Sequence, residues 1–141
     1  MRKRLVPAVC ALLLGLASPL VWPAAPAPAD SVSFSFGAVG DFGANSNTAA
    51  TLTAMHNAAP DLTLALGDFS YSQVTPESAW CNFVKGYMGS TYPFELIAGN
   101  HDDNGPDGVI SNFTACLPDR IGNLTGSYGK ELTFTLSTTT P

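Results

Sequence analysis

Basic side chains are scarce in this sequence. It has six Lys and Arg residues against eleven Asp and Glu, and three of the six stand among the first four positions. A chain with so few positive charges repels a phosphate backbone, so the composition argues against nucleic-acid binding through a basic patch. An anionic substrate would need bound cations beside it.

Long hydrophobic runs are also missing. The main apolar stretch, 5–21, is interrupted by two prolines and a glycine and falls short of the roughly 20 residues that a membrane span needs. It follows three basic residues and leads to an A-x-A cleavage site ending at Ala29. This pattern predicts a signal peptide over 1–29, secretion to an extracellular or periplasmic space, and no stable membrane span after cleavage. The alternative is an uncleaved membrane anchor.

The sequence has three cysteines and no C-x-x-C pair. Without that pair and a matching histidine spacing, a zinc site built from thiolates is disfavoured. Cys10 lies in the predicted signal peptide, which leaves Cys81 and Cys116 as an even pair in an exported chain. We therefore predict a disulfide between them. The remaining length, 30–141, allows one small domain, and nothing in it indicates an oligomeric state.

Alternation and helical periodicity predict a β-α-β-α-β order. The expected strands and helices are 31–39, 46–59, 62–66, 76–88 and 94–98. Ser46 or Asn47 would cap the first helix, and Thr75 would cap the second, with Pro76 at its first position. This order is typical of parallel strands with right-handed crossovers, so the predicted fold class is α/β.

The C-terminal part has weaker signals. Residues 103–129 are rich in Gly, Asn, Asp and Pro and are predicted to form a long loop. Alternation at Leu132, Phe134 and Leu136 suggests a fourth strand.

Polar residues follow all three predicted strands. Asp41, Asp68 and the pair Asn100-His101 stand at successive strand ends, each after a glycine. Ligand sites of open α/β sheets lie beyond these carboxyl ends, so the side chains should converge. Carboxylate, carboxamide and imidazole groups suit Mn, Zn or Fe. One such aspartate alone is more often a turn cap, but three in register favour a site.

These residues resemble the conserved blocks of the calcineurin-like metallophosphoesterases, in their purple acid phosphatase-like variant. The D-x-G, G-D-x-x-Y and G-N-H-[DE] blocks correspond to Asp41-Phe42-Gly43, Gly67-Asp68-Phe69-Ser70-Tyr71 and Gly99-Asn100-His101-Asp102. The resemblance implies that 30–141 is the N-terminal part of a metallophosphoesterase α/β sandwich. It also implies hydrolysis of small phosphate monoesters at a two-metal site, with Fe paired with Fe, Zn or Mn.

By the same resemblance, Asp41 binds one metal, Asp68 bridges both, Tyr71 gives a phenolate to the first, and Asn100 binds the second. His101 is implied as the catalytic residue, placed over the phosphate to stabilise the transition state or protonate the leaving oxygen. Tyr71 could instead be an ordinary turn tyrosine, and His101 a capping or core histidine.

The sequence departs from the family in its histidines. The family takes three more from V-x-x-H and G-H-x-H segments, whereas this chain has only His56 and His101. His56 lies on the apolar stripe of the first helix and is predicted to be a core residue. We therefore expect a truncated or frame-shifted chain of a secreted phosphoesterase, and the alternative is that the chain is an inactive fragment by itself. The rivals are a catalytically dead paralogue and a non-catalytic exported metal-binding module with a calcium loop at 102–108.

Overall fold

A three-stranded parallel sheet organises the chain. The computed structural model describes residues 33–103 and 105–134. The sheet has the order β1 (Phe36–Val39), β2 (Leu62–Ala65), β3 (Phe94–Leu96), and all its pairs are parallel. The helices α1 (Ser46–Ala58) and α2 (Glu77–Met88) connect successive strands. The predicted α/β class and β-α-β-α-β order are confirmed. The predicted signal peptide lies outside the described residues.

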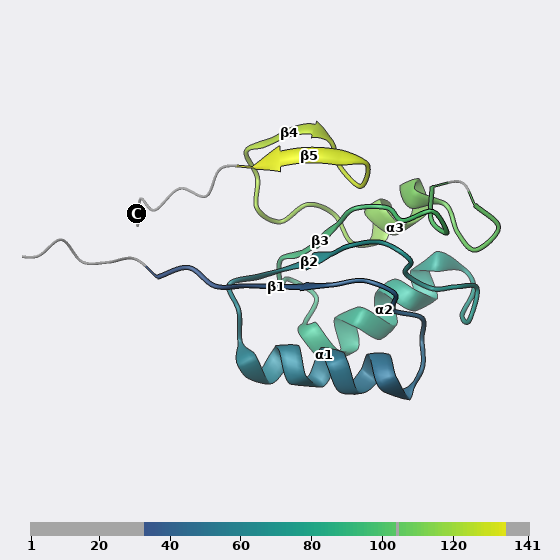
Figure 1. Cartoon of the computed structure of the whole chain (residues 1–141), viewed down its shortest axis with the longest axis horizontal. Helices are drawn as coiled ribbons and strands as arrows, with labels where there is room; N and C mark the ends of the chain where they lie inside the picture. Colours follow the sequence, from purple (N-terminus) through teal and green to yellow (C-terminus); the bar gives the residue numbers. More distant parts are fainter. Residues whose placement is uncertain (1–32, 104, 135–141) are drawn as a thin grey trace, which may run out of the picture. The chain divides into compact units, whose positions relative to one another are not determined.

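Both crossover helices lie on one side of the sheet (Figure 1). Between them and the strands is an aromatic core whose members are all buried: Phe42, Phe69, Trp80, Phe94 and Phe113. Trp80 stacks on Phe69, with ring centroids 5.0 Å apart, and meets Phe42 and Phe113 edge-on at 5.6 Å. On α2, the buried residues Trp80, Val84 and Met88 recur at helical spacing and form the wall of this core.

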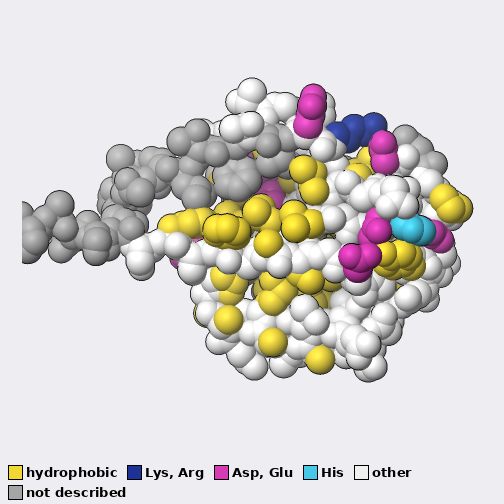
Figure 2. All heavy atoms as spheres, in the orientation of Figure 1, with side chains coloured by type: hydrophobic (Ala, Val, Ile, Leu, Met, Phe, Trp, Pro, Cys, Tyr) yellow, Lys and Arg dark blue, Asp and Glu magenta, His cyan; other side chains and the backbone are white. Residues whose placement is uncertain are grey.

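The opposite side of the sheet is less covered. Phe36 is 60% exposed and Leu66 is 54% exposed, and Figure 2 shows hydrophobic side chains running across the middle of the visible surface. Successive side chains of a strand point to opposite faces, and Phe94 and Leu96 point toward the helices. Glu95, between them, therefore points away from the helices. It is nevertheless buried, and its Oε1 accepts a hydrogen bond from the backbone N–H of Arg120 at 2.9 Å.

The long loop predicted over 103–129 is wrong. This segment contains α3 (Ile110–Cys116) and β4 (Leu124–Ser127), and β4 pairs antiparallel with β5 (Glu131–Phe134). The seven-residue α3 lacks a side-chain cap, and it buries Ile110 and Phe113 on one face. Packing against α2, rather than local propensity, accounts for it. The fourth strand is confirmed at β5, which forms a separate two-stranded sheet, and residues 135–136 lie outside the described part.

Three predicted boundaries need correction. Residues 33–35 are not part of β1; there, Ser35 binds the Asp61 carboxylate through its backbone N–H at 2.7 Å. The cap of α1 is Asn45, whose side chain accepts from the N–H groups of Asn47 and Thr48. Helix α2 starts after Pro76 and has no side-chain cap.

His56 is not a core residue. It is exposed, because the buried line of α1 runs through Thr48, Leu52 and the half-buried Met55. The predicted apolar stripe included His56 and Ala59, so it was rotated around the helix axis relative to the buried side that the structure shows. Ala59 is itself exposed and ends α1 in the left-handed conformation.

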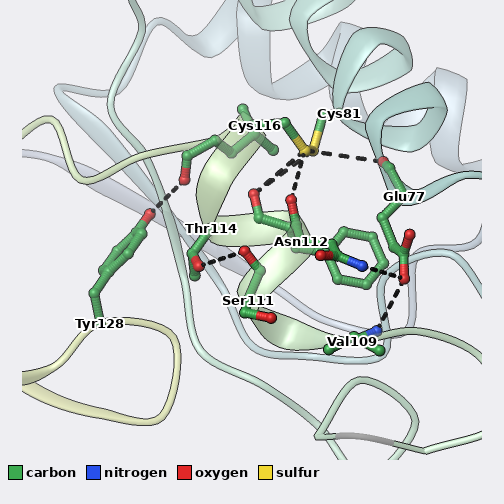
Figure 3. Close-up of a disulfide and its surroundings, with 10 residues drawn as sticks. Glu77, Cys81, Val109, Ser111, Asn112, Thr114, Cys116 and Tyr128 are labelled. Carbon is green, nitrogen blue, oxygen red and sulfur yellow. Dashed lines mark hydrogen bonds between the residues drawn. A yellow bond between two sulfur atoms is a disulfide. The ribbon is translucent and has the colours of Figure 1, made fainter.

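The disulfide predicted between Cys81 and Cys116 is confirmed. It joins α2 to α3, with Cα atoms 6.0 Å apart (Figure 3). Beside it, Glu77 Oε1 accepts hydrogen bonds from the backbone N–H of Val109 at 3.1 Å and from Asn112 Nδ2 at 3.2 Å. A covalent and a polar link therefore hold α3 against α2. In the described part of the chain, no helix is long and apolar enough to span a bilayer.

Candidate metal centre

The carboxyl ends of β1, β2 and β3 meet at one edge of the sheet. The backbone N–H of Phe42 donates to the carbonyl of Asp68 at 2.8 Å, so the first two strand ends are joined. A Cβ atom on Gly99 would collide with the Asp68 carboxylate, which explains the glycine at the third. Asp41 and Asp68 have φ values of 55° and 56°. Aspartate tolerates this left-handed backbone better than most residues do.

Three oxygen atoms from two strand ends converge here. The Tyr71 hydroxyl donates to Asp41 Oδ1 at 2.6 Å and lies 2.9 Å from Asp68 Oδ2. The hydrogen bond to Asp41 is the main reason why the pKa of Tyr71 lies far above its usual value, with desolvation and Asp68 adding to it. A cation bound among these oxygens would oppose that shift by favouring the phenolate.

Asp102 holds this edge together from inside. It is fully buried, and its carboxylate accepts hydrogen bonds from the backbone N–H groups of Asp68 at 2.5 Å, Phe69 at 3.0 Å and Gly99 at 3.2 Å. Burial raises the pKa of Asp102, although the three bonds oppose the rise. Sequence reasoning assigned Asp102 no role at the strand-end site, although it ends the G-N-H-[DE] block, and placed it only in the alternative calcium loop. It positions the Asp68 turn against the end of β3.

His101 lies beside the three oxygens. Its backbone N–H donates to Asp68 Oδ1 at 3.2 Å, and its ring centroid is 4.6 Å from that of Tyr71. Its Nδ1 is 2.5 Å from Asp107 Oδ2. This bond raises the pKa of His101 and lowers the pKa of Asp107. In Figure 2, acidic side chains surround a histidine at one end of the visible surface. Asp107 was predicted only within the alternative calcium loop and not at the strand-end site, because it follows no strand.

The comparison with protein families matches the calcineurin-like phosphoesterase family over residues 34–134. The chain belongs to the calcineurin-like phosphoesterase family. Neither the curated proteins nor the solved structures include a match to it. The matched residues of this calcineurin-like phosphoesterase contain all three strand ends and the β4–β5 hairpin. Membership in a family of metal-dependent phosphoesterases indicates phosphate esters as the substrate class.

The donor set of this phosphoesterase fits one metal position better than two. The Tyr71 hydroxyl lies within hydrogen-bond distance of one carboxylate oxygen of Asp41 and one of Asp68, and such oxygen ligands suit a hard cation. For a second position the structure offers Asp68 and Asn100, and Asn100 is exposed. Within residues 33–103 and 105–134, no group of three His, Cys, Asp or Glu side chains could hold a metal. His56, on α1, is not among the residues gathered at the strand ends.

The calcium loop considered for 102–108 does not fit this arrangement. Asp102 is occupied by three backbone N–H groups. Asp103 pairs instead with Lys130 at 3.1 Å, and Asp107 binds His101 and Ser72. Calcium needs oxygens that surround one point. These carboxylates serve three separate partners, which disfavours a calcium loop.

Proposed function

We propose that this member of the family is an exported phosphatase of the purple acid type, which hydrolyses small phosphate monoesters. The observation that carries the proposal is the convergence of Tyr71 Oη with Asp41 Oδ1 and Asp68 Oδ2 at 2.6 and 2.9 Å. A phenolate next to two carboxylates is a ligand set for ferric iron. The strand-end position of the cluster also agrees with where α/β sheets bind ligands.

In this proposal each residue has one task. Asp41, Asp68 and Tyr71 would hold an iron ion, and Asp68 together with Asn100 would hold a second ion, which would be Fe, Zn or Mn. The metals, when bound, would supply an activated water and neutralise charge on the phosphoryl group. His101 would act on the phosphate or on the leaving oxygen, since its ring lies beside Tyr71. The cleft of about 160 Å³ that borders Asp41 and the first turn of α1 is not lined by Asp68, Tyr71 or His101, so we do not assign it to the substrate.

Ferric iron titrated into the full chain tests the metal part of the proposal. A phenolate bound to Fe(III) absorbs visible light, so we expect a visible band that saturates with iron and disappears in Tyr71→Phe. Tyr87→Phe is the matched control, since Tyr87 lies on α2 and its ring meets that of Phe83 edge-on. Asp68→Asn should weaken iron binding without disturbing the left-handed turn, which asparagine tolerates. A band that survives Tyr71→Phe would refute the assignment.

Turnover of p-nitrophenyl phosphate tests the catalytic part. With Fe(III) and Zn(II) or Mn(II) present, hydrolysis should depend on Asp68 and fall by about 100-fold or more in His101→Ala. Iron binding without Asp68-dependent turnover would reduce the proposal to a metal-binding module. Absence of both would contradict the proposal as a whole.

A further inference from the structure

The two ring nitrogens of His101 are in different environments. Nδ1 is 2.5 Å from Asp107 Oδ2. An ionised carboxylate can only accept a hydrogen bond, so Nδ1 carries the hydrogen atom in this pair. In the neutral ring Nε2 then has the free lone pair. Among the described residues Nε2 has no hydrogen-bond partner, so it is the nitrogen left for a ligand.

Asp107 is itself held by the turn that carries Asp68 and Tyr71. Ser72 Oγ donates to Asp107 Oδ1 at 3.0 Å, and Ser70 Oγ, which is almost fully buried, donates to the backbone carbonyl of Asp107 at 3.0 Å. The bond from Ser72 fixes the side chain of Asp107, and the bond from Ser70 fixes its backbone. Asp107 is therefore tied to the turn that carries the proposed metal ligands Asp68 and Tyr71.

Residues 105–108 lie close to the turn that carries His101. Gly105 and Gly108 form an antiparallel bridge with each other. A Cβ atom on Gly105 would lie 2.9 Å from the carbonyl oxygens of Asn100 and His101, a contact that real Cβ atoms avoid. On its other side, the His101 ring meets the Tyr71 ring at an interplanar angle of 52°. The imidazole is thus held between a carboxylate and an aromatic ring.

We propose that Asp107 is a positioning residue for His101. It fixes the ring in the Nδ1–H tautomer and in one orientation, so that Nε2 is the atom presented to a bound phosphate ester. The role of Nε2 toward the ester rests on the proposed phosphatase function, whereas the tautomer is a property of the chain alone. A carboxylate that fixes the tautomer of a functional histidine acts through that histidine and touches no substrate.

Nitrogen NMR of the imidazole groups tests the tautomer without any metal. The chain has two histidines, and the exposed His56 is an internal reference, so two ring systems are observed. In the ¹⁵N-labelled metal-free chain, at a pH where both rings are neutral, we expect His101 to be mainly Nδ1–H and His56 mainly Nε2–H. In Asp107→Ala the His101 population should shift toward that of His56.

Two further variants separate the hydrogen bond from charge and folding. Asp103→Ala removes the same charge from the same loop but leaves Asp107 in place, because Asp103 pairs with Lys130 instead. It should not change the His101 tautomer. Ser72→Ala keeps the carboxylate but removes its anchor, and should shift the population part of the way. If Asp107→Ala does not fold, as judged by its backbone amide spectrum, the Ser72→Ala shift decides the question.

The inference is overturned if His101 in the unchanged chain is mainly Nε2–H, or if Asp103→Ala shifts the tautomer as much as Asp107→Ala does. It is also overturned if Asp107→Ala removes the visible iron band, since Asp107 would then be a metal ligand. Failure of the unchanged chain to bind iron would instead contradict the proposed function. The tautomer result would stand, so the two failures are distinguishable.

Discussion

The two faces of the β1-β2-β3 sheet are built differently. Toward α1 and α2, Phe94 and Leu96 join a closed aromatic core around Trp80. On the other face Phe36 is 60% exposed, while the acidic Glu95 is buried and its Oε2 has no partner in the described residues. The helical face therefore provides most of the hydrophobic stabilisation, and the other face contains a destabilising group. The candidate metal centre lies between the two faces, at the edge of the sheet where β1, β2 and β3 end.

The largest expected effect is on the helical face. Trp80→Ala should lower the free energy of unfolding by about 3–5 kcal/mol, because it empties the centre of the core. It also removes the hydrogen bond from Nε1 to the Gly43 carbonyl, 2.9 Å long. Urea denaturation measures the change. Phe36→Ala, on the open face, is the matched aromatic control and should change stability by about 0.5 kcal/mol or less. Equal losses in the two variants would abolish the contrast between the faces.

The next effect concerns the attachment of α3 to the helical face. Replacing both Cys81 and Cys116 by serine should lower the free energy of unfolding by about 3–4 kcal/mol, on the chain-entropy estimate for a loop of this length. Guanidinium melts of the oxidised chain and the double variant measure it. The Cys116→Ser single variant should match the double variant. A much smaller loss would show that the Glu77 bonds to Val109 and Asn112 alone hold α3.

A third prediction concerns the edge where the faces meet. Asp102→Ala leaves three backbone N–H groups, one of them buried and two partly buried, without their acceptor and should destabilise the chain by about 2–3 kcal/mol. Because two of these groups belong to Asp68 and Phe69, iron binding should weaken as well. Asp103→Ala, one residue away and exposed, should affect neither quantity. Thermal melts and iron titrations of both variants provide the comparison. Undiminished iron binding in Asp102→Ala would mean that the Asp68 turn keeps its geometry without this carboxylate.

Sequence periodicity anticipated the helical face better than the rest of the fold. Helix α2 and the three strands were predicted because apolar patterns have a period, and Asp41, Asp68 and His101 were found because they follow strand ends. The short α3 escaped prediction, because seven residues beside a Gly- and Pro-rich segment carry little periodic signal. His56 was wrongly predicted to be buried, because an apolar pattern along a helix cannot distinguish a residue on the buried side from its immediate neighbour in sequence.

The polar contacts of the site were less predictable than its strand-end residues. The roles of Asp102 and Asp107 depend on which backbone groups and side chains tertiary folding brings to them, since the carboxylate of Asp102 binds residues 33 and 34 positions away. No local pattern encodes such distances. The same holds for Glu95, which interrupts an otherwise apolar strand and whose burial depends on the distant segment that contains Arg120.

Glu95 gives the smallest and most specific prediction, since it concerns the cost of a buried acid on the less covered face. Desolvation raises the pKa of Glu95 above that of the unfolded chain, and the neighbouring Asp119 adds to the rise. The folded state therefore binds this proton more tightly, and its stabilising contribution is lost as pH rises through the raised pKa. Glu95→Gln keeps an oxygen for the Arg120 N–H and removes the charge. It should stabilise the chain by about 1 kcal/mol at neutral pH, and the gain should shrink toward the unfolded pKa.

Urea melts over a series of pH values test this difference. Glu131→Gln, an exposed glutamate on β5, is the matched control and should give no pH-dependent gain. If Glu95→Gln were destabilising at neutral pH, Glu95 would have to be a stabilising partner of Arg120 and Tyr128. Glu95 would then stabilise the less covered face. Both faces would contribute favourably to stability, the helical face through apolar packing and the other through polar interactions.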